Sequence, residues 1–239
     1  MKPRYNILVT SGGTREYIDD VRVMTNISSG KLGRIIAQEF VGLLYEKIIF
    51  KEASVNFIYG KHTECPDHVQ ILKYPVDSAQ ETYNKMQELV PQMDAVIHCM
   101  AVSDFTFKKD AAIKCKSHDP EAFIEYMRRT ITLNPKIIAQ IKKWNPNVLL
   151  VGFKFEVGAS IAELETLAKA SIERNGCDLV VANDKEEIKR QNEHIGHFFF
   201  SEPMKERGFN NFDQAGKLKI AVALSEFILR ALTPEGLFK

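Results

Sequence analysis

Short apolar runs alternate with segments of helical pattern along most of this chain, and that alternation constrains its fold more than any other feature. Residues 5–10 form an apolar run that ends in Ser-Gly-Gly, which is typical of a buried strand entering a loop. Similar runs predict strands at 55–60, 69–76, 94–104, 147–156, 177–184 and 194–201, and helical spacing predicts helices at 30–47, 77–92, 160–176 and 213–232. The alternation predicts an α/β fold with a doubly wound, mostly parallel, Rossmann-like sheet.

One segment breaks the alternation. Residues 105–132 are rich in lysine, hold little periodic apolar pattern and are too long for a simple connection. We therefore expect an excursion from the sheet that serves as a lid, as an oligomerisation arm or as both. With 239 residues and 45% apolar residues, the remainder suffices for one large domain spanning 1–239.

Charge and cysteine content exclude several classes of protein. The formal net charge of +1 indicates neither a nucleic-acid nor a membrane partner. The apolar runs are far shorter than a membrane span, and the N-terminus lacks the apolar stretch of a signal peptide. Four scattered cysteines (Cys65, Cys99, Cys115 and Cys177) show no metal-ligand spacing, so we expect reduced thiols in a cytoplasmic protein and no metal site.

Two donor-rich loops, residues 11–14 and 28–33, lie about a dozen residues apart near the N-terminus. Gly12 and Gly13 allow the backbone close to a ligand, while the helix beginning near Gly30 offers free N–H groups and a positive dipole end. Neither GxGxxG nor GxxxxGK[ST] is present, so the loops match no standard nucleotide fingerprint. The alternatives are a phosphate cradle, or a tight turn followed by a capped helix.

Polar residues follow several of the predicted strands. They stand at residues 10–14, at Asp104, at 153–156 and at 183–184. Each alone is ordinary loop chemistry, but ligands of an open parallel sheet bind beyond the carboxyl ends of its strands. Four such ends on one sheet edge therefore indicate a binding site there.

The order of residues 12–33, "GGTREYIDDVRVMTNISSGKLG", resembles the N-terminal signature of the phosphopantothenoylcysteine synthetases, also called phosphopantothenate–cysteine ligases. Members of this family carry Gly-Gly-Thr-Arg-Glu, then Asp-x-Val-Arg (here shortened to Asp-Val-Arg), then Asn-x-Ser-Ser-Gly-Lys-x-Gly. The likeness continues in the family's order at 101–105, 133–138, 151–156 and 178–184, and so covers nearly the whole chain. Within this family, the chain looks like a stand-alone bacterial form.

The resemblance implies a ligase of coenzyme A biosynthesis. A nucleoside triphosphate would convert the carboxylate of 4′-phosphopantothenate into an acyl nucleotidate and release pyrophosphate. The amine of L-cysteine would then displace the nucleoside monophosphate. A protein that does this must hold two anions together and neutralise developing charge.

Site residues follow from the resemblance by matching the motifs. Asn26 and Lys114 are the implied catalytic residues, because an amide can donate to a developing oxyanion and a lysine can neutralise the triphosphate. Arg15, Arg22, Lys31 and Ala101 are the implied substrate residues, although each arginine has the alternative of a surface ion pair with Glu16 or Asp19. The implied nucleotide-binding residues are Gly12, Gly13, Thr14, Ser28, Ser29, Gly30, Asp104, Asn134, Pro135, Phe153 and Asn183.

Some positions depart from the family pattern. The mobile segment after Asp104 usually reads Lys-Ile-Lys-Lys, but Ala112 replaces its first lysine, which leaves Lys114 as the candidate. Ser171 and Asn175 stand where the helix at 161–175 usually presents lysines. These changes affect the expected triphosphate contacts. We expect CTP rather than ATP as co-substrate.

The resemblance also implies partners. Mg²⁺ would arrive with the triphosphate, no flavin is expected, and a separate decarboxylase would take the product. The family is dimeric, with the segment 105–132 reaching toward the partner, and residues 185–195 correspond to a flap.

Two other readings stay open. A nucleotide-cofactor-binding oxidoreductase would use the same class of sheet, although GxGxxG and the acidic residue that should follow it are missing. A non-catalytic nucleotide-binding dimer would bind nucleotide without releasing pyrophosphate.

Overall fold

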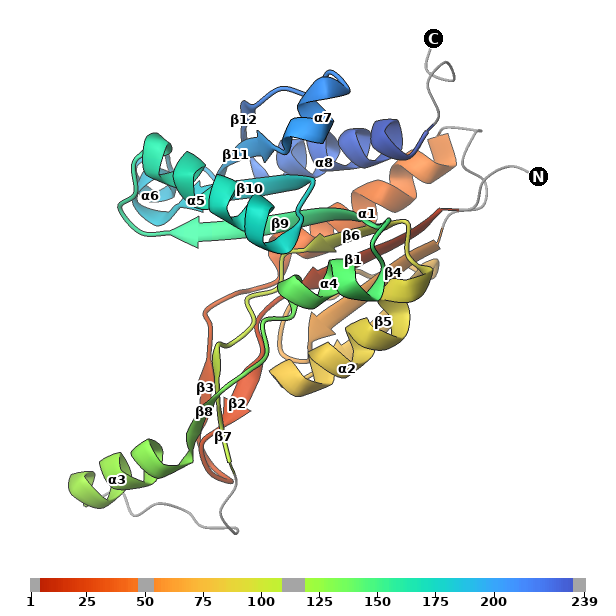
Figure 1. Ribbon diagram of the computed structural model, residues 1–239. Helices are drawn as coiled ribbons and strands as arrows, with labels where there is room; N and C mark the ends of the chain where they lie inside the picture. The colour runs from red at the N-terminus through yellow and green to blue at the C-terminus, as the bar shows by residue number, and fades with distance from the viewer. Residues whose placement is uncertain (1–4, 47–53, 109–118, 234–239) are drawn as a thin grey trace.

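The computed structural model describes residues 5–46, 54–108 and 119–233. Its centre is one sheet in the strand order β12-β11-β10-β9-β6-β1-β4-β5 (Figure 1). Six neighbouring strands, β5, β4, β1, β6, β9 and β10, run parallel to one another. Strand β11 is antiparallel to β10, and β12 is antiparallel to β11. The strands are β1 (Asn6–Ser11), β4 (Ser54–Gly60), β5 (Ile71–Val76), β6 (Ala95–His98), β9 (Leu149–Glu156), β10 (Leu179–Asp184), β11 (Ile195–Phe200) and β12 (Phe212–Ala215). The predicted doubly wound, mostly parallel sheet is confirmed.

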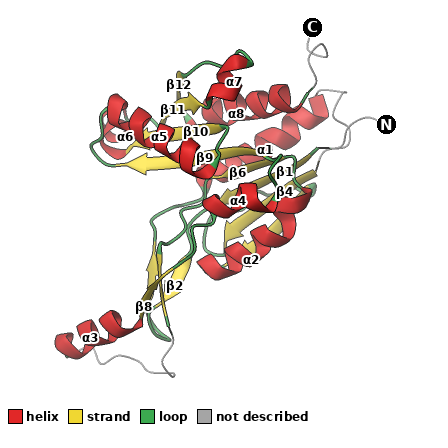
Figure 2. Cartoon of the chain, viewed as in Figure 1, coloured by secondary structure: helices red, strands yellow, loops and turns green. Residues whose placement is uncertain are grey.

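Helices cover both faces of the sheet, as Figure 2 shows. One face packs against α1 and α8, and the other against α2, α4 and α5. Successive residues of β1 alternate between the two cores, with Ile7 and Val9 on the α1 side and Leu8 on the α2 side. The helices are α1 (Lys31–Glu46), α2 (Ala79–Leu89, extended by the 3-10 turn η2, Val90–Gln92), α4 (Ile138–Trp144), α5 (Ile161–Asn175), α6 (Lys185–Gln191), α7 (Glu202–Glu206) and α8 (Lys217–Leu232).

Helix boundaries follow local capping. In α5 the Ser160 side chain accepts from the backbone N–H of Glu163, whose carboxylate in turn accepts from the Ser160 N–H, so the pair forms a capping box. Gly176 ends this helix in the left-handed conformation with φ 69°. The predicted α5 is thus held at both ends by residues that the sequence displays.

A slender extension leaves the sheet beyond β1 and β6 (Figure 1). It consists of the hairpin β2 (Arg15–Tyr17) with β3 (Val23–Thr25), the pair β7 (Phe105–Phe107) with β8 (Ile131–Leu133), and α3 (Pro120–Thr130). The hydroxyl of Tyr126 on α3 donates to the carbonyl of Ile18 at 2.7 Å and so joins the two halves. The described parts of the segment 105–132, residues 105–108 and 119–132, therefore leave the sheet as expected and share the extension with the residues between the two N-terminal loops.

Several predicted boundaries were wrong. The strand predicted at 94–104 ends at His98, because residues 99–104 turn off to enter the extension. The helix predicted from residue 213 begins at Lys217, because Gly216 has φ 91° and the residues before it pair with β11 as β12. The Asn134-Pro135 pair, which the family resemblance places at the start of a helix, lies before α4, because this helix begins at Ile138.

None of the helices in the described part of the chain combines the length and apolar character needed to cross a membrane.

Candidate functional site

The sheet reverses its winding between β1 and β6, and the loops that follow these strands are tied together there. From β1 the chain proceeds outward to β4 and β5, then returns to β6 on the other side. Gly13 bridges Ala101, and the Ala101 N–H donates to the Gly12 carbonyl at 2.8 Å. Ligand sites of such sheets form at this switch point, beyond the carboxyl ends of the strands.

Glycines let the first turn of α1 approach these loops closely. Gly12 and Gly30 have φ values of 82° and 76°, which disfavour other residues. A Cβ on Gly33 would lie 2.4 Å from Ser11 Oγ. The Ser11 hydroxyl donates to the Gly30 carbonyl at 2.9 Å. The helix N-terminus is therefore fixed against the end of β1 at the switch point, and the Lys31 N–H donates to Ser29 Oγ at 3.2 Å.

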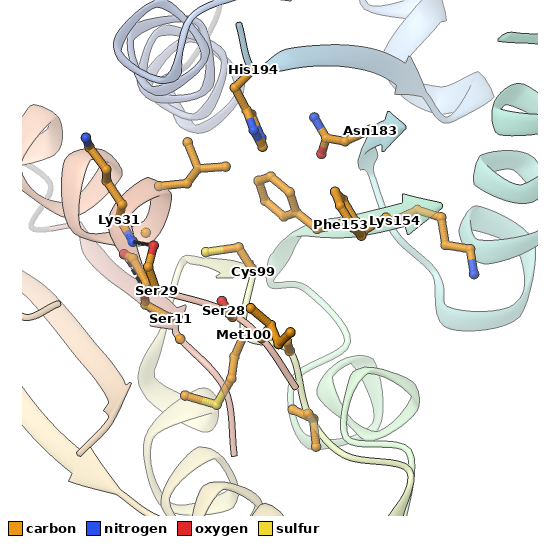
Figure 3. Close-up of a pocket in the computed structure, with 18 of the residues that line it drawn as sticks. Ser11, Ser28, Ser29, Lys31, Cys99, Met100, Phe153, Lys154, Asn183 and His194 are labelled. Carbon is orange, nitrogen blue, oxygen red and sulfur yellow. Dashed lines mark hydrogen bonds between the residues drawn. The ribbon is translucent and has the colours of Figure 1, made fainter. Parts of the chain in front are cut away.

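A cavity of about 500 Å³ opens at this point. Figure 3 shows side chains from α1, β9, β10 and the loops after β1 and β6 around it. Its lining comprises Ser11, Gly12, Ile27, Ser28, Ser29, Gly30, Lys31, Leu32, Gly33, Cys99, Met100, Ala101, Val102, Asp104, Lys136, Phe153, Lys154, Phe155, Asn183, His194 and Lys217. This volume is within the range of small-molecule sites.

One end of the cavity carries positive charge. Lys31 and Lys217 are the first residues of α1 and α8, two helices that pack against each other. Partial burial, and next the charge of Lys31, lower the pKa of Lys217. Neither lysine forms an ion pair with a described residue, since nearby Glu64 is held by Arg34 at 2.7 Å.

A neutral histidine lies beside this charge. His194 stands just before β11, and its ring points into the cavity near Asn183 and Phe153 (Figure 3). Burial, and next the charge of Lys217, lower the pKa of His194 to about 4. Its Nε2 is buried and finds no hydrogen-bond partner among the described residues.

A smaller cavity of about 160 Å³ adjoins the first. Lys136 Nζ donates to Asp104 Oδ1, and both residues line the two cavities, as Phe153 does. The other lining residues of the small cavity are His98, Met100, Val102, Ser103, Pro135, Ile137 and Ile138. The ion pair therefore lies where the two cavities meet.

Two groups at the floor of the site are held uncharged by burial. Burial lowers the pKa of His98 to about 4, and its Nδ1 lies 2.8 Å from the hydroxyl of Thr10. Burial raises the pKa of the Cys99 thiol to about 12, and this thiol donates to the Thr10 carbonyl. Cys99 therefore lacks the thiolate character of a nucleophilic cysteine.

Most of the residues that the family resemblance implies lie at this one cavity. Those among its lining are Gly12, Ser28, Ser29, Gly30, Lys31, Ala101, Asp104, Phe153 and Asn183. The four polar strand ends noted in the sequence belong to β1, β6, β9 and β10, which are neighbours in the sheet. Pro135 lines the smaller cavity. Lys114 falls outside the described residues.

The other implied residues lie in the walls and in the extension. Thr14 is buried, and its hydroxyl accepts from the Ser103 N–H at 2.9 Å, while Gly13 lies in the bridge to Ala101. The Asn134 side chain donates to the Ser103 carbonyl at 3.0 Å. Exposed Asn26 donates to the Ala101 carbonyl at 3.3 Å and so adjoins the cavity.

Both arginines belong to the β2–β3 hairpin, where Arg15 is the first residue of β2 and Arg22 immediately precedes β3. Arg15 begins β2, and its backbone N–H donates to the Asp77 carbonyl at 2.7 Å. Arg22 pairs with buried Asp19 at 3.0 Å, and its guanidinium lies 5.1 Å from the Phe123 ring centroid. Of the alternatives weighed for Arg22, this chain forms the ion pair with Asp19; a substrate contact stays a prediction.

Sequence reasoning missed several residues of the cavity. His194 and Lys217 come from the C-terminal part of the chain. Lys154 lies within the strand predicted at 147–156, and Lys136 directly follows the Asn134-Pro135 pair. One signal was visible for Lys217: it follows a glycine at the start of a helix, as Lys31 does. Nothing in the sequence around His194 indicated a cavity.

No group of three or more His, Cys, Asp or Glu side chains within the described ranges is arranged to hold a metal ion. Glu64, a carboxylate that acts on Lys217, is paired with Arg34.

Comparison with known proteins gives two kinds of match. Residues 3–231 match the family described as DNA/pantothenate metabolism flavoprotein C-terminal domain. The coenzyme A biosynthesis bifunctional protein CoaBC of Thermococcus kodakarensis is 40% identical over 179 residues, which are 74% of this chain and 40% of that protein. The chain thus spans about two fifths of the length of such relatives.

Solved structures agree with the fold. The DNA/pantothenate metabolism flavoprotein of Streptococcus pneumoniae superposes with a TM-score of 0.76 at 29% identity, covering 95% of this chain and 99% of that one. A Cab2 mutant, H337A, described as a complex with phosphopantothenate-cysteine, shares the fold with a TM-score of 0.68 at 15% identity, covering 96% and 89%. The chain belongs to the DNA/pantothenate metabolism flavoprotein C-terminal domain family, and its resemblance to the phosphopantothenoylcysteine synthetases is thereby confirmed.

Proposed function

We propose that this protein joins 4′-phosphopantothenate to L-cysteine, with CTP as the activating nucleotide. The observation that carries the proposal is the cavity at the switch point, where motif residues from both N-terminal loops meet Asp104, Phe153 and Asn183. The bifunctional relatives act in coenzyme A biosynthesis by name, and the Cab2 structure is described as holding phosphopantothenate-cysteine. Those descriptions support the substrate class proposed for this chain.

In the first step a carboxylate oxygen of 4′-phosphopantothenate attacks the α-phosphorus of CTP. A C(O)O–P bond forms, the bond to the β-phosphate oxygen breaks, and pyrophosphate leaves. Ser29 and the N–H groups of the first turn of α1 are the donors proposed to bind the phosphates, with Lys31 as a cation. Mg²⁺ enters as the CTP complex, so the metal comes with the substrate.

In the second step the free amine of cysteine attacks the activated carbonyl. The amide bond forms, CMP leaves with the former carboxylate oxygen, and the amine proton passes to solvent or to the departing phosphate. Asn26 Nδ2 adjoins the Ala101 carbonyl at the cavity edge and is the donor proposed for the oxyanion. An amide suits this role because it donates without changing its charge.

The experiment is a pyrophosphate-release assay with phosphopantothenate, cysteine and either CTP or ATP. Using phosphopantothenate labelled with ¹⁸O in its carboxylate, one label should appear in CMP and none in inorganic phosphate. Label in inorganic phosphate would mean an acyl-phosphate path. No pyrophosphate with either nucleotide would reject the ligase, and binding of NADH or FMN would favour the oxidoreductase alternative.

We also propose that the protein works as a homodimer joined through the extension, and that a decarboxylase takes its product. The extension exposes apolar side chains, including Leu133 at 72% and Ile124 at 54%. Such side chains on a slender arm favour burial against a second copy.

A further inference from the structure

Two lysines that line one end of the cavity form no ion pair with a described residue. Lys31 and Lys217 occupy the first positions of two helices of 16 residues each, and Gly30 and Gly216 precede them. Partial burial, and next the charge of Lys31, lower the pKa of Lys217, so the two ammonium groups lie close enough to interact. Lys31 is exposed and Lys217 is half-buried, and two like charges at such a place repel each other until an anion binds between them.

An independent observation points to a ligand at the same place. The buried Nε2 of His194 has no hydrogen-bond partner among the described residues, although buried polar atoms are nearly always paired. His194 lies close enough to Lys217 to feel its charge. An acceptor or donor from a ligand would satisfy this atom.

We propose that Lys217 and His194 bind the polyphosphate chain of the nucleotide together with Lys31. This rests on the proposed function and extends it to residues at the far end of the chain. Helix α5 offers no substitute, because its Ser171 and Asn175 are uncharged, bond to each other at 3.1 Å and lie outside the cavity lining. The other lysines of the lining, Lys136 and Lys154, pair with Asp104 and Glu156. Among the described residues of the lining, the lysines outside ion pairs therefore come from the first turns of α1 and α8.

The amount of charge favours a polyphosphate over a phosphate monoester. The two lysines contribute two charges and each helix N-terminus about half a charge, roughly three in all. A phosphate monoester carries at most about two negative charges near neutral pH, whereas a triphosphate carries more. The phosphate of phosphopantothenate would leave this end under-compensated.

The test measures binding of inorganic tripolyphosphate by isothermal titration calorimetry. In Lys217→Gln the affinity should fall about 10- to 100-fold, because a charge-assisted contact is lost. The matched control is Lys219→Gln, an exposed lysine two positions further along α8, which should change the affinity less than about 2-fold. His194→Phe should weaken binding as well. Wild-type affinity in Lys217→Gln would overturn the proposal.

A second measurement separates this inference from the function it rests on. In the ligase assay Lys217→Gln should raise KM for the nucleotide and leave KM for phosphopantothenate unchanged. The opposite pattern would assign the lysine to the other substrate and overturn the inference. Tripolyphosphate binding needs no turnover, so it can support the inference even where the ligase assay fails. Conversely, normal turnover with unaltered tripolyphosphate binding in Lys217→Gln would reject only the inference.

Discussion

Asn26 is a residue whose place is fixed by two loops at once. Its side chain donates to the Ala101 carbonyl at 3.3 Å, and its own carbonyl would lie 2.8 Å from a Cβ on Gly13. It is nevertheless exposed, so its amide is available at the cavity edge. Holding a neutral donor still while one face stays open is the arrangement that transition-state stabilisation requires.

Replacing Asn26 with Ala should therefore affect chemistry more than binding. We expect kcat to fall about 10²- to 10³-fold with a small change in KM, because the donor would act on the oxyanion of the second step. Acyl cytidylate should accumulate and can be detected by rapid quench and mass spectrometry. Asn147→Ala, at an exposed site in the turn before β9, serves as the control. Unchanged turnover in the Asn26 variant would remove this residue from the mechanism.

Among the elements, α1 joins the site to the sheet through one close approach. Gly33 sits where a Cβ would lie 2.4 Å from Ser11 Oγ and 3.0 Å from Cys99 Sγ. On the same helix, Gly42 has no atom within 4 Å of such a Cβ. The same substitution should thus have opposite effects at the two positions.

Gly33→Ala should lower the free energy of unfolding by more than about 1 kcal/mol, since α1 must shift from β1. Gly42→Ala should raise it by about 0.5–1 kcal/mol, because alanine restricts the unfolded chain and favours helix. Urea unfolding followed by circular dichroism measures both. Equal effects would contradict the close packing of this helix on the switch point.

Helix α6 is held to the sheet edge by a buried histidine. His197 on β11 lies 2.7 Å from Glu187 on α6 and 2.7 Å from Asp213 on β12. Burial lowers the pKa of His197, but the hydrogen bonds and charges of the two carboxylates outweigh burial and raise it overall. Asp184 also accepts from the Glu187 N–H at 2.9 Å and caps the helix. Whether residues 185–195 move as a flap stays a prediction.

This histidine should make stability depend on pH. Because its pKa is higher in the folded state, its contribution is complete below about pH 6.5 and is lost as the pH rises through the raised value. The difference in unfolding free energy between wild type and His197→Gln should therefore be larger at pH 6 than at pH 9. His62→Gln, at an exposed site, should show no such change. A difference independent of pH would mean that His197 stays neutral.

On the scale of the whole molecule, the extension is the part that the fold itself does not bury. It exposes Val21 at 65%, Phe105 at 44% and Leu133 at 72%, although the Arg15 N–H of β2 bonds to the Asp77 carbonyl just after β5. The β2–β3 hairpin and the β7–β8 strand pair are too small to be stable alone with this much apolar surface exposed to water. This shape is the basis for expecting a second copy.

Leu133→Glu should therefore convert the proposed dimer into a monomer. A charge at a buried apolar contact costs far more than at an open surface, so the sedimentation coefficient should fall to the monomer value. Val69→Glu is the matched control, because Val69 is 97% exposed and lies away from the extension. Val69 precedes the first residue of β5, whereas the extension contacts Asp77, just after the last residue of that strand. A Leu133→Glu protein that stays dimeric would place the interface elsewhere.

Much of the sheet was predictable because most of its strands are apolar and the helices that cover it carry capping residues. The runs at β1, β4, β9 and β10 and the Ser160 and Gly176 ends of α5 are local signals. The hairpins of the extension were not predicted, because strands of three residues have too few positions to show a period. Strand β12 was not predicted, because its sequence is polar and it forms a strand by pairing with β11.

The sequence by itself determined the order of elements, the family and the motif residues of the two N-terminal loops, because each depends on neighbours along the chain. Tertiary structure alone decided that His194 and Lys217 line the same cavity as those loops. It also decided that the side chains of Thr14 and Asn134 both hydrogen-bond to the backbone of Ser103, in the wall beside the cavity. The physical reason is that burial and charge depend on what packs nearby in space. Winding the sheet brings α8 beside α1 across almost 200 residues of sequence, and no local pattern records that contact.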